Sequence, residues 1–185
     1  MRGDTAASPV IYLKPGEMHL SAEPSRVTTV LGSCVSVTMF SPRLGVGAIS
    51  HVMLPKCKCR GHCEEGCIYY FHGGCQRNCA DGFKYADCSM AAMLAKLRNL
   101  GIGNDELEIK LFGGSDMFSP DGGKDNVINI GKQNIAAAMK IIEEEGLSLV
   151  TYDVGGTHGR KIIFYTHTGD ILLKRLNGGE EGGRQ

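Results

Sequence analysis

Alternating apolar and polar residues in the first third of the chain predict short β-strands. Residues 35–40 alternate in this way, residues 41–45 read Ser-Pro-Arg-Leu-Gly, as a turn would, and residues 46–54 alternate again. Two earlier apolar runs, residues 10–13 and 26–31, are separated by turn-forming residues. The pattern predicts a hairpin around the turn, with two further strands before it.

The second half of the chain combines helical spacing with more strands. Apolar residues recur at steps of three and four between residues 85 and 100, and Gly101 offers a stop. Helical spacing returns over residues 132–145 and ends at Gly146. Strand patterns cover four segments, residues 107–112, 147–154, 161–166 and 171–176. The last two of these segments form a hairpin, and the whole pattern indicates a mixed α/β protein.

The predicted hairpin brings a cysteine and a histidine to one face. If the turn leaves Ser41 opposite Val46, then Cys34 and His51 become diagonal neighbours across the two strands. The opposite face then carries only apolar side chains, which are Val35, Val37, Met39, Val46, Ala48 and Val52. This register predicts a core face on one side and a thiol beside an imidazole on the other.

Cys34 follows a bend whose residue types suit nucleophilic chemistry. Gly32 can adopt backbone angles closed to other residues, so Gly32 and Ser33 are expected to present Cys34 at a sharp turn. Successive N–H groups in such a turn can form an oxyanion hole. A neighbouring imidazole favours the thiolate and can return a proton to a leaving group. Thr28 is the candidate for the polar group that orients His51, although a cysteine and a histidine on strands are also ordinary structural residues.

Composition and charge narrow the partners of this chain. Its 185 residues include 20 Lys and Arg and 20 Asp and Glu. The formal charge is therefore balanced, and there is no excess of positive charge to favour binding to nucleic acid or an anionic membrane. No apolar stretch is long enough for membrane insertion, and the N-terminus lacks a secretory signal. We therefore expect a cytoplasmic protein whose eight cysteines are kept reduced or bind metal.

Several short motifs follow one another in order along nearly the whole chain. They occupy residues 31–37, 45–55, 84–87, 112–118, 129–134, 153–156 and 159–160. The first holds Leu-Gly-Ser-Cys and the second ends in His-Val-Met-Leu-Pro. Together the motifs resemble the signature of the CheD family of chemoreceptor glutamine deamidases. An ordered set of this length is far more specific than Gly-Ser-Cys alone.

The resemblance implies a layered α/β/β sandwich of mixed sheets with two main helices, similar to the fold of cysteine-dependent toxin deamidases. It implies Cys34 as the nucleophile and His51 as the base. The threonine of the implied triad stands six residues before the cysteine, which selects Thr28 over the adjacent Thr29. Gly32 and Ser33 are expected to support the bend.

The implied reaction converts glutamine to glutamate on the helical cytoplasmic region of methyl-accepting chemotaxis receptors, through a thioester on the cysteine. The resemblance also implies a CheC-type phosphatase as a protein partner. No cofactor is required for the implied catalysis.

A cysteine-rich insert over about residues 56–83 departs from the family, which has a short polar linker at this place. Its six cysteines are Cys57, Cys59, Cys63, Cys67, Cys75 and Cys79. Four converging thiolates would suit a structural zinc ion, and an iron–sulfur cluster would also use four. None of the spacings is Cys-x-x-Cys, so disulfides and unpaired thiols stay open as alternatives. We expect one domain over residues 1–176, including the insert, and a flexible tail over residues 177–185.

Two non-enzymatic interpretations stand beside the deamidase. The chain could be an adaptor that binds receptor and phosphatase while Cys34 is idle, or a metal or redox sensor built on the insert. A thioester could also be captured by an amine, as in a transglutaminase. The product mass, metal analysis and a count of reactive thiols separate these interpretations.

Overall fold

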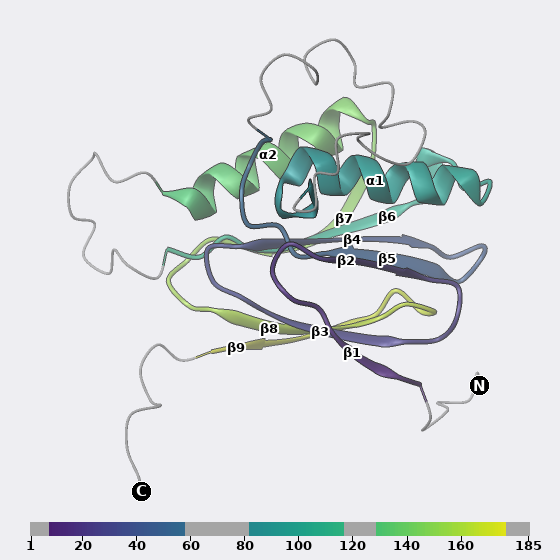
Figure 1. Cartoon of the computed structure of the whole chain (residues 1–185), viewed down its shortest axis with the longest axis horizontal. Coiled ribbons are helices and arrows are strands. Elements are labelled where there is room, and N and C mark those ends of the chain that lie inside the picture. The colour runs from purple at the N-terminus through teal and green to yellow at the C-terminus, as the bar shows by residue number, and fades with distance from the viewer. Residues whose placement is uncertain (1–7, 58–81, 117–128, 177–185) are drawn as a thin grey trace, which may run out of the picture.

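Three layers make up the part of the chain that the structure, a computed structural model, describes, namely residues 8–57, 82–116 and 129–176. Two helices, α1 (Ala86–Asn99) and α2 (Ile130–Glu144), lie on one face of a five-stranded sheet. The opposite face of that sheet packs against a four-stranded sheet (Figure 1). The predicted α/β/β sandwich with two main helices is therefore confirmed.

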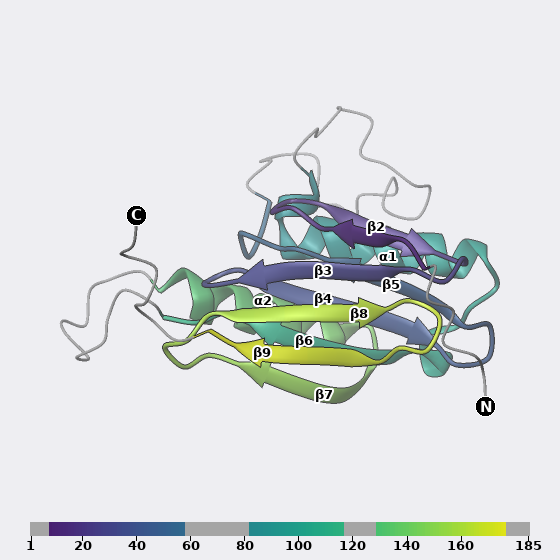
Figure 2. The same ribbon diagram turned by 90° about the horizontal axis from the view of Figure 1, so that it is seen from below.

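Both sheets are mixed. The five-stranded sheet consists, in order, of β2 (Met18–Ser21), β5 (Val46–Ser50), β4 (Val35–Ser41), β6 (Glu108–Gly113) and β7 (Ser148–Val154). The four-stranded sheet consists of β1 (Val10–Tyr12), β3 (Arg26–Leu31), β8 (Arg160–Tyr165) and β9 (Ile171–Arg175). Strand pairs β6–β7 and β1–β3 are parallel and the others antiparallel. Figure 2 shows the four-stranded sheet stacked on the five-stranded one.

The β4–β5 hairpin has the predicted register. Ser41 is paired with Val46, and the same register continues to an isolated bridge between Val35 and Val52. Regular pairing in β5 ends at Ser50, four residues earlier than the alternation suggested. The register matters for the site, because it sets which residues of the two strands share a face.

A large apolar cluster fills the space between the helices and the five-stranded sheet. All six side chains predicted for the core face of the hairpin belong to this cluster. A smaller cluster, formed around Leu31, Ile49, Phe112, Ile162 and Phe164, lies between the two sheets. Every residue of β4 and β5 is buried, so the second face of the hairpin is covered as well. The expectation of a single buried face was incomplete, because the alternation of the hairpin alone does not show that the second sheet covers its other face.

Strand β2 was not predicted. Its four residues, Met-His-Leu-Ser, are too few for a clear alternation, yet they pair with β5 from Met18–Ser50 to Ser21–Gly47. Two short 3₁₀ turns, Gly82–Lys84 and Asn104–Glu106, were also not predicted. The remaining predicted strands and both helices are present within a few residues of their expected bounds.

Most of the predicted insert and the predicted tail lie outside the described residues. The described helices include none that is both long and apolar enough to cross a membrane.

Candidate active site

Cys34 stands in the connection between β3 and β4. Its thiol is unpaired and half-buried, and the side chain packs against the inter-sheet cluster. The backbone bends at Gly32 and Ser33, as predicted. The three consecutive carbonyl oxygens of residues 32, 33 and 34 each accept a hydrogen bond. Their donors are, in that order, Ser115 N at 2.9 Å, Asn134 Nδ2 at 3.1 Å and Gly114 N at 2.8 Å.

The unusual backbone angles lie in the loop that supports Cys34. Gly113 has φ of 102° and Gly114 has φ of 69°, a region that favours glycine. A Cβ atom on Gly113 would collide with the carbonyl oxygen of Cys34, and one on Gly114 would collide with Ile135. Gly32 is not among the described glycines with positive φ. The special conformation expected at Gly32 therefore occurs in the facing loop, which must approach the Cys34 backbone closely.

His51 lies between the two sheets and is buried, with 2% of its surface exposed. Its backbone is fixed by the residues just before β2, because His51 N donates to the Glu17 carbonyl and Gly16 N donates to the His51 carbonyl. The ring nitrogen Nδ1 is 2.7 Å from Thr29 Oγ1, and this hydrogen bond joins the two sheets. The imidazole is thus held by both its backbone and its ring.

The surroundings of Nδ1 determine the tautomer of His51. The hydroxyl of Thr29 donates its one hydrogen to the Leu13 carbonyl oxygen at 2.8 Å. The oxygen of Thr29 can then only accept from His51, so Nδ1 carries the proton. In the neutral ring Nε2 is left with its lone pair, which is the form that a general base requires.

The structure assigns the contact with His51 to Thr29 and not to Thr28 as predicted. The hydroxyl of Thr28 donates to the Ile162 carbonyl at 3.2 Å within its own sheet. Successive side chains of a strand point to opposite faces, and Thr29 shares its face with buried Val27. Thr28 lies on the opposite face of β3, so it cannot orient His51.

Burial shifts the pKa of both reactive groups toward the neutral forms. Desolvation raises the pKa of the Cys34 thiol, and a hydrogen bond from the Cys34 backbone amide offsets part of that rise. Desolvation lowers the pKa of His51, while the Leu13 carbonyl and the charge of Glu17 act in the opposite direction. The resting pair at neutral pH is therefore a thiol and a neutral imidazole. In the observed register these two residues lie on the same face of the hairpin, as predicted.

Arg160 fixes the loop that supports the bend. Its side chain is only 5% exposed and pairs with Asp153, which also binds Arg175. The guanidinium donates to Ser115 Oγ at 2.6 Å and to the Gly155 carbonyl at 2.9 Å. The two arginines lower the pKa of Asp153 against the opposing effect of its desolvation. Arg160 thus connects the last strands of the chain to the support of Cys34.

The metal-site prediction rests mainly on residues outside the described part of the chain. Of the six cysteines of the insert only Cys57 is described, and its backbone N–H donates to both carboxylate oxygens of Asp87 at 3.1 Å. The N–H of Cys88 donates to Asp87 Oδ1 at 2.8 Å. Within residues 8–57, 82–116 and 129–176 no group of three or more metal-ligating side chains is found. Zinc, an iron–sulfur cluster and disulfides stay predictions.

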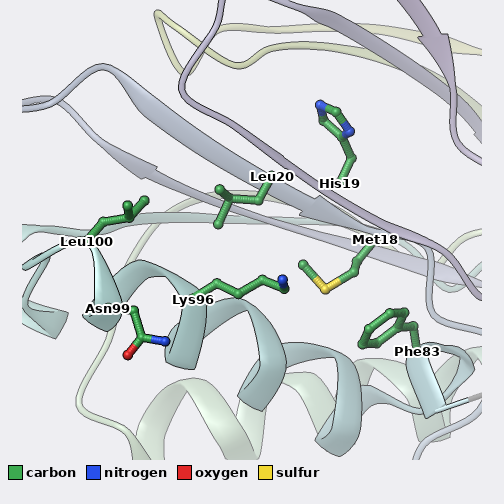
Figure 3. A pocket seen from close by; sticks show the side chains of 7 residues that line it. All are labelled: Met18, His19, Leu20, Phe83, Lys96, Asn99 and Leu100. Atoms are coloured by element: carbon green, nitrogen blue, oxygen red, sulfur yellow. The ribbon is translucent and has the colours of Figure 1, made fainter. Parts of the chain in front are cut away.

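An apolar groove lies between β2 and α1, away from the residues that hold Cys34. It is lined by Met18, His19, Leu20, Phe83, Lys96, Asn99 and Leu100 (Figure 3). Neither the thiol nor the imidazole contributes to its lining. The groove is therefore a separate feature from the candidate active site.

The fold is a layered α/β/β sandwich, and its candidate site holds a thiol and an imidazole whose tautomer is fixed by Thr29. Comparisons with known proteins show which family this chain belongs to. Residues 73–175 match the family described as CheD chemotactic sensory transduction. The chain is 44% identical over 169 residues to "Probable chemoreceptor glutamine deamidase CheD 2" of Geobacter sulfurreducens, with 91% of each chain covered.

Two further relatives carry the name "Probable chemoreceptor glutamine deamidase CheD". The protein of Maridesulfovibrio salexigens is 38% identical over 90% of this chain and 91% of its own. That of Methanococcus maripaludis strain C6 is 30% identical over 90% of this chain and 95% of its own. This chain belongs to the CheD family.

Proposed function

We propose that the protein hydrolyses the side-chain amide of glutamine in the cytoplasmic region of chemotaxis receptors. The names of its relatives support the reaction and the substrate class. The observation that carries the proposal is the Thr29–His51 contact, because it leaves Nε2 of the imidazole available as a base. The thiol of Cys34 is on the same face of the hairpin.

In the first half of the proposed reaction, Nε2 of His51 takes the thiol proton as the sulfur of Cys34 attacks the amide carbon. The resulting oxyanion is stabilised by backbone N–H groups of the bend. Collapse of this intermediate breaks the carbon–nitrogen bond, and the imidazolium gives its proton to the leaving ammonia. A thioester on Cys34 remains, with the imidazole neutral again.

In the second half, Nε2 of His51 removes a proton from water as the water oxygen attacks the thioester. The carbon–sulfur bond then breaks, and glutamate leaves with the thiol restored. The overall change consumes one water and releases one ammonia per glutamine. Because both resting groups are neutral, the base acts during the attack, and a preformed ion pair is not needed.

The test is mass spectrometry of a chemoreceptor cytoplasmic fragment incubated with the reduced protein. We expect a gain of about 1 Da per converted glutamine with wild type and none with Cys34→Ala, as nucleophilic catalysis requires. Cys57→Ala serves as a matched thiol control and should keep the activity. Binding of the fragment by wild type without any mass gain would instead support an adaptor. Binding of a CheC-type phosphatase stays a prediction.

A further inference from the structure

One fully buried amide contacts the backbone on both sides of the site. Asn134 belongs to α2 and is 0% exposed. Its nitrogen Nδ2 donates to the Ser33 carbonyl oxygen at 3.1 Å and to the Met53 carbonyl oxygen at 3.0 Å. Ser33 immediately precedes Cys34, and Met53 follows His51 by two residues. A single side chain of the helical layer thus links the nucleophile segment to the base segment.

The first of these hydrogen bonds fixes the amide of the nucleophile. The carbonyl of Ser33 and the N–H of Cys34 belong to one planar peptide unit, which is trans, so they point in opposite directions. Holding the carbonyl toward α2 therefore turns the N–H of Cys34 away from the helix. That N–H donates the hydrogen bond that favours the thiolate of Cys34.

The second hydrogen bond fixes the segment beyond the base. Between His51 and Met53, Val52 forms two backbone hydrogen bonds with Val35, of 3.0 Å and 2.8 Å. Asn134 extends this connection to Ser33, two residues before Val35, and to Met53, one residue after Val52. Beyond the Val35–Val52 bridge, one amide nitrogen thus contacts both segments beside the site.

Helix α2 is itself fixed against the loop that supports Cys34. Its N-cap residue Asn129 donates to Asp116 Oδ2 at 2.6 Å. Gly131 lies so close to Gly114 that a Cβ atom on Gly131 would be 2.5 Å from the Gly114 carbonyl oxygen. The amide of Asn134 is thus presented from a rigid support, which a positioning role requires.

The two sides of the Asn134 amide differ in their partners. Its Oδ1 is buried and has no hydrogen-bond partner within the described part of the chain. A buried, unpaired acceptor is costly, and an apolar residue of similar shape would avoid that cost. The burial of Asn134 is explained by the two carbonyl oxygens, of Ser33 and Met53, to which its side-chain nitrogen donates.

We propose that Asn134 is a positioning residue, which orients the Cys34 amide through the Ser33 carbonyl and keeps the His51 strand at its working distance through the Met53 carbonyl. The kinetic part of this inference rests on the proposed deamidase function. The part that concerns the thiol does not, because the reactivity of Cys34 can be measured without a receptor.

The experiment compares wild type with Asn134→Leu, which keeps the approximate volume and removes both donors, and with Asn134→Gln, which keeps a donor. Gln133→Leu, at the exposed neighbouring position of the same helix, is the matched control. Alkylation of Cys34 by iodoacetamide is followed by peptide mass spectrometry from pH 6 to 10, and receptor deamidation is measured in parallel. Asn134→Ala replaces Asn134→Leu where the larger residue prevents folding.

For Asn134→Leu we expect kcat to fall about 10–100-fold with KM little changed, as for loss of an oriented transition-state donor. The alkylation midpoint should move to higher pH, so that the rate at pH 7.5 falls several-fold, and Asn134→Gln should recover part of both effects. A folded Asn134→Leu variant with an unchanged alkylation profile and unchanged kcat would overturn the inference. A shifted alkylation profile in a protein that never deamidates receptor would support the positioning of Cys34 and overturn the proposed function alone.

Discussion

The two faces of the β4–β5 hairpin are both buried, yet they are built from different chemistry. The face toward the helices contributes only Val, Met and Ala side chains to the larger cluster, together with buried Ser41 and Ser50. The face toward the second sheet carries Ser36, Thr38 and His51 among its apolar residues. The helical face of the hairpin is mainly apolar, whereas its inter-sheet face combines apolar side chains with two hydroxyl groups and an imidazole.

Within this one pair of strands, the helical face contributes mainly to the stability of the fold, and the inter-sheet face carries the residue proposed as the base. Apolar contacts on the helical face are interchangeable in kind, because only volume and shape matter there. On the inter-sheet face, the buried imidazole of His51 can act as a base only if a hydrogen bond fixes its tautomer. Thr29 of the other sheet supplies that hydrogen bond. The second sheet therefore contributes to the site directly and does more than cover the first.

The largest effect should come from opening the helical face. Leu111→Ala removes a fully buried side chain of the larger cluster and should lower the free energy of unfolding by about 2–5 kcal/mol. Below the melting range kcat should stay within about twofold of wild type, because Leu111 packs on the helical side of the sheet and His51 lies on the other side. Urea denaturation and receptor deamidation at 15 °C check both points. A large loss of kcat in the folded variant would show that the two faces are not separable.

A smaller loss of stability, now joined by a loss of activity, is expected from Arg160→Met. Removing one partner of a buried pair costs about 3 kcal/mol here, at the lower end of the usual range because Asp153 keeps Arg175. Arg160 also holds Ser115, whose N–H supports the Gly32 carbonyl, so kcat should fall as well. Thermal unfolding and deamidation rates measure the two effects. Arg175→Met, at the exposed end of the network, is the control, and equal losses in both variants would contradict the assignment.

The two adjacent threonines of β3 test the inter-sheet contact itself. Thr29→Val removes the hydroxyl that faces His51 and should lower kcat about 10–100-fold, since the imidazole loses its orientation. Thr28→Val, on the other face of the strand, should stay within about twofold of wild type. Steady-state deamidation kinetics compare the pair. The reverse order would return the role to Thr28, as the motif spacing had indicated.

The smallest effect concerns pH. Burial lowers the pKa of His51 in the folded protein, whereas the unfolded histidine titrates near about 6.5. Below that pH the unfolded state binds more protons, so the stability contributed by neutral His51 is present above it and is lost as pH falls toward the folded pKa. The free energy of unfolding from urea titrations should be about 1 kcal/mol higher at pH 7.5 than at pH 5.5 in wild type.

A His51→Leu variant provides the control for this pH effect. It should show a smaller difference, although His19, whose pKa burial also lowers, leaves part of the effect in place. An unchanged difference in His51→Leu would mean that other groups carry the pH dependence.

The local pattern of apolar and polar residues predicted most helices and strands, whereas the pairing of distant strands determines which residues surround His51. Alternation and a five-residue turn were enough to place Cys34 and His51 on one face, because a hairpin register depends only on neighbouring sequence. The pairing of β3 with β8 joins residues 129 to 139 positions apart, and no local pattern indicates it. The resemblance implied a second sheet, but local patterning could not show which of its residues face the site.

Two residues that the sequence reasoning missed had left a signal. Thr29 has the same parity as the apolar Val27 and Leu31, so strand alternation alone would have turned it inward. Asn134 falls on the buried stripe of α2 with Gly131 and Ala138, where a polar residue needs a partner. What the sequence did not supply was the identity of those partners.

The carboxylate of Asp87 has a consequence for how this protein can be modified. It accepts hydrogen bonds from the backbone N–H groups of Cys57 and Cys88, so one side chain in the first turn of α1 holds Cys57 against that helix. A substitution of Asp87 would therefore remove the acceptor of two backbone N–H groups at once, whereas Cys57→Ala keeps the N–H group and with it the contact.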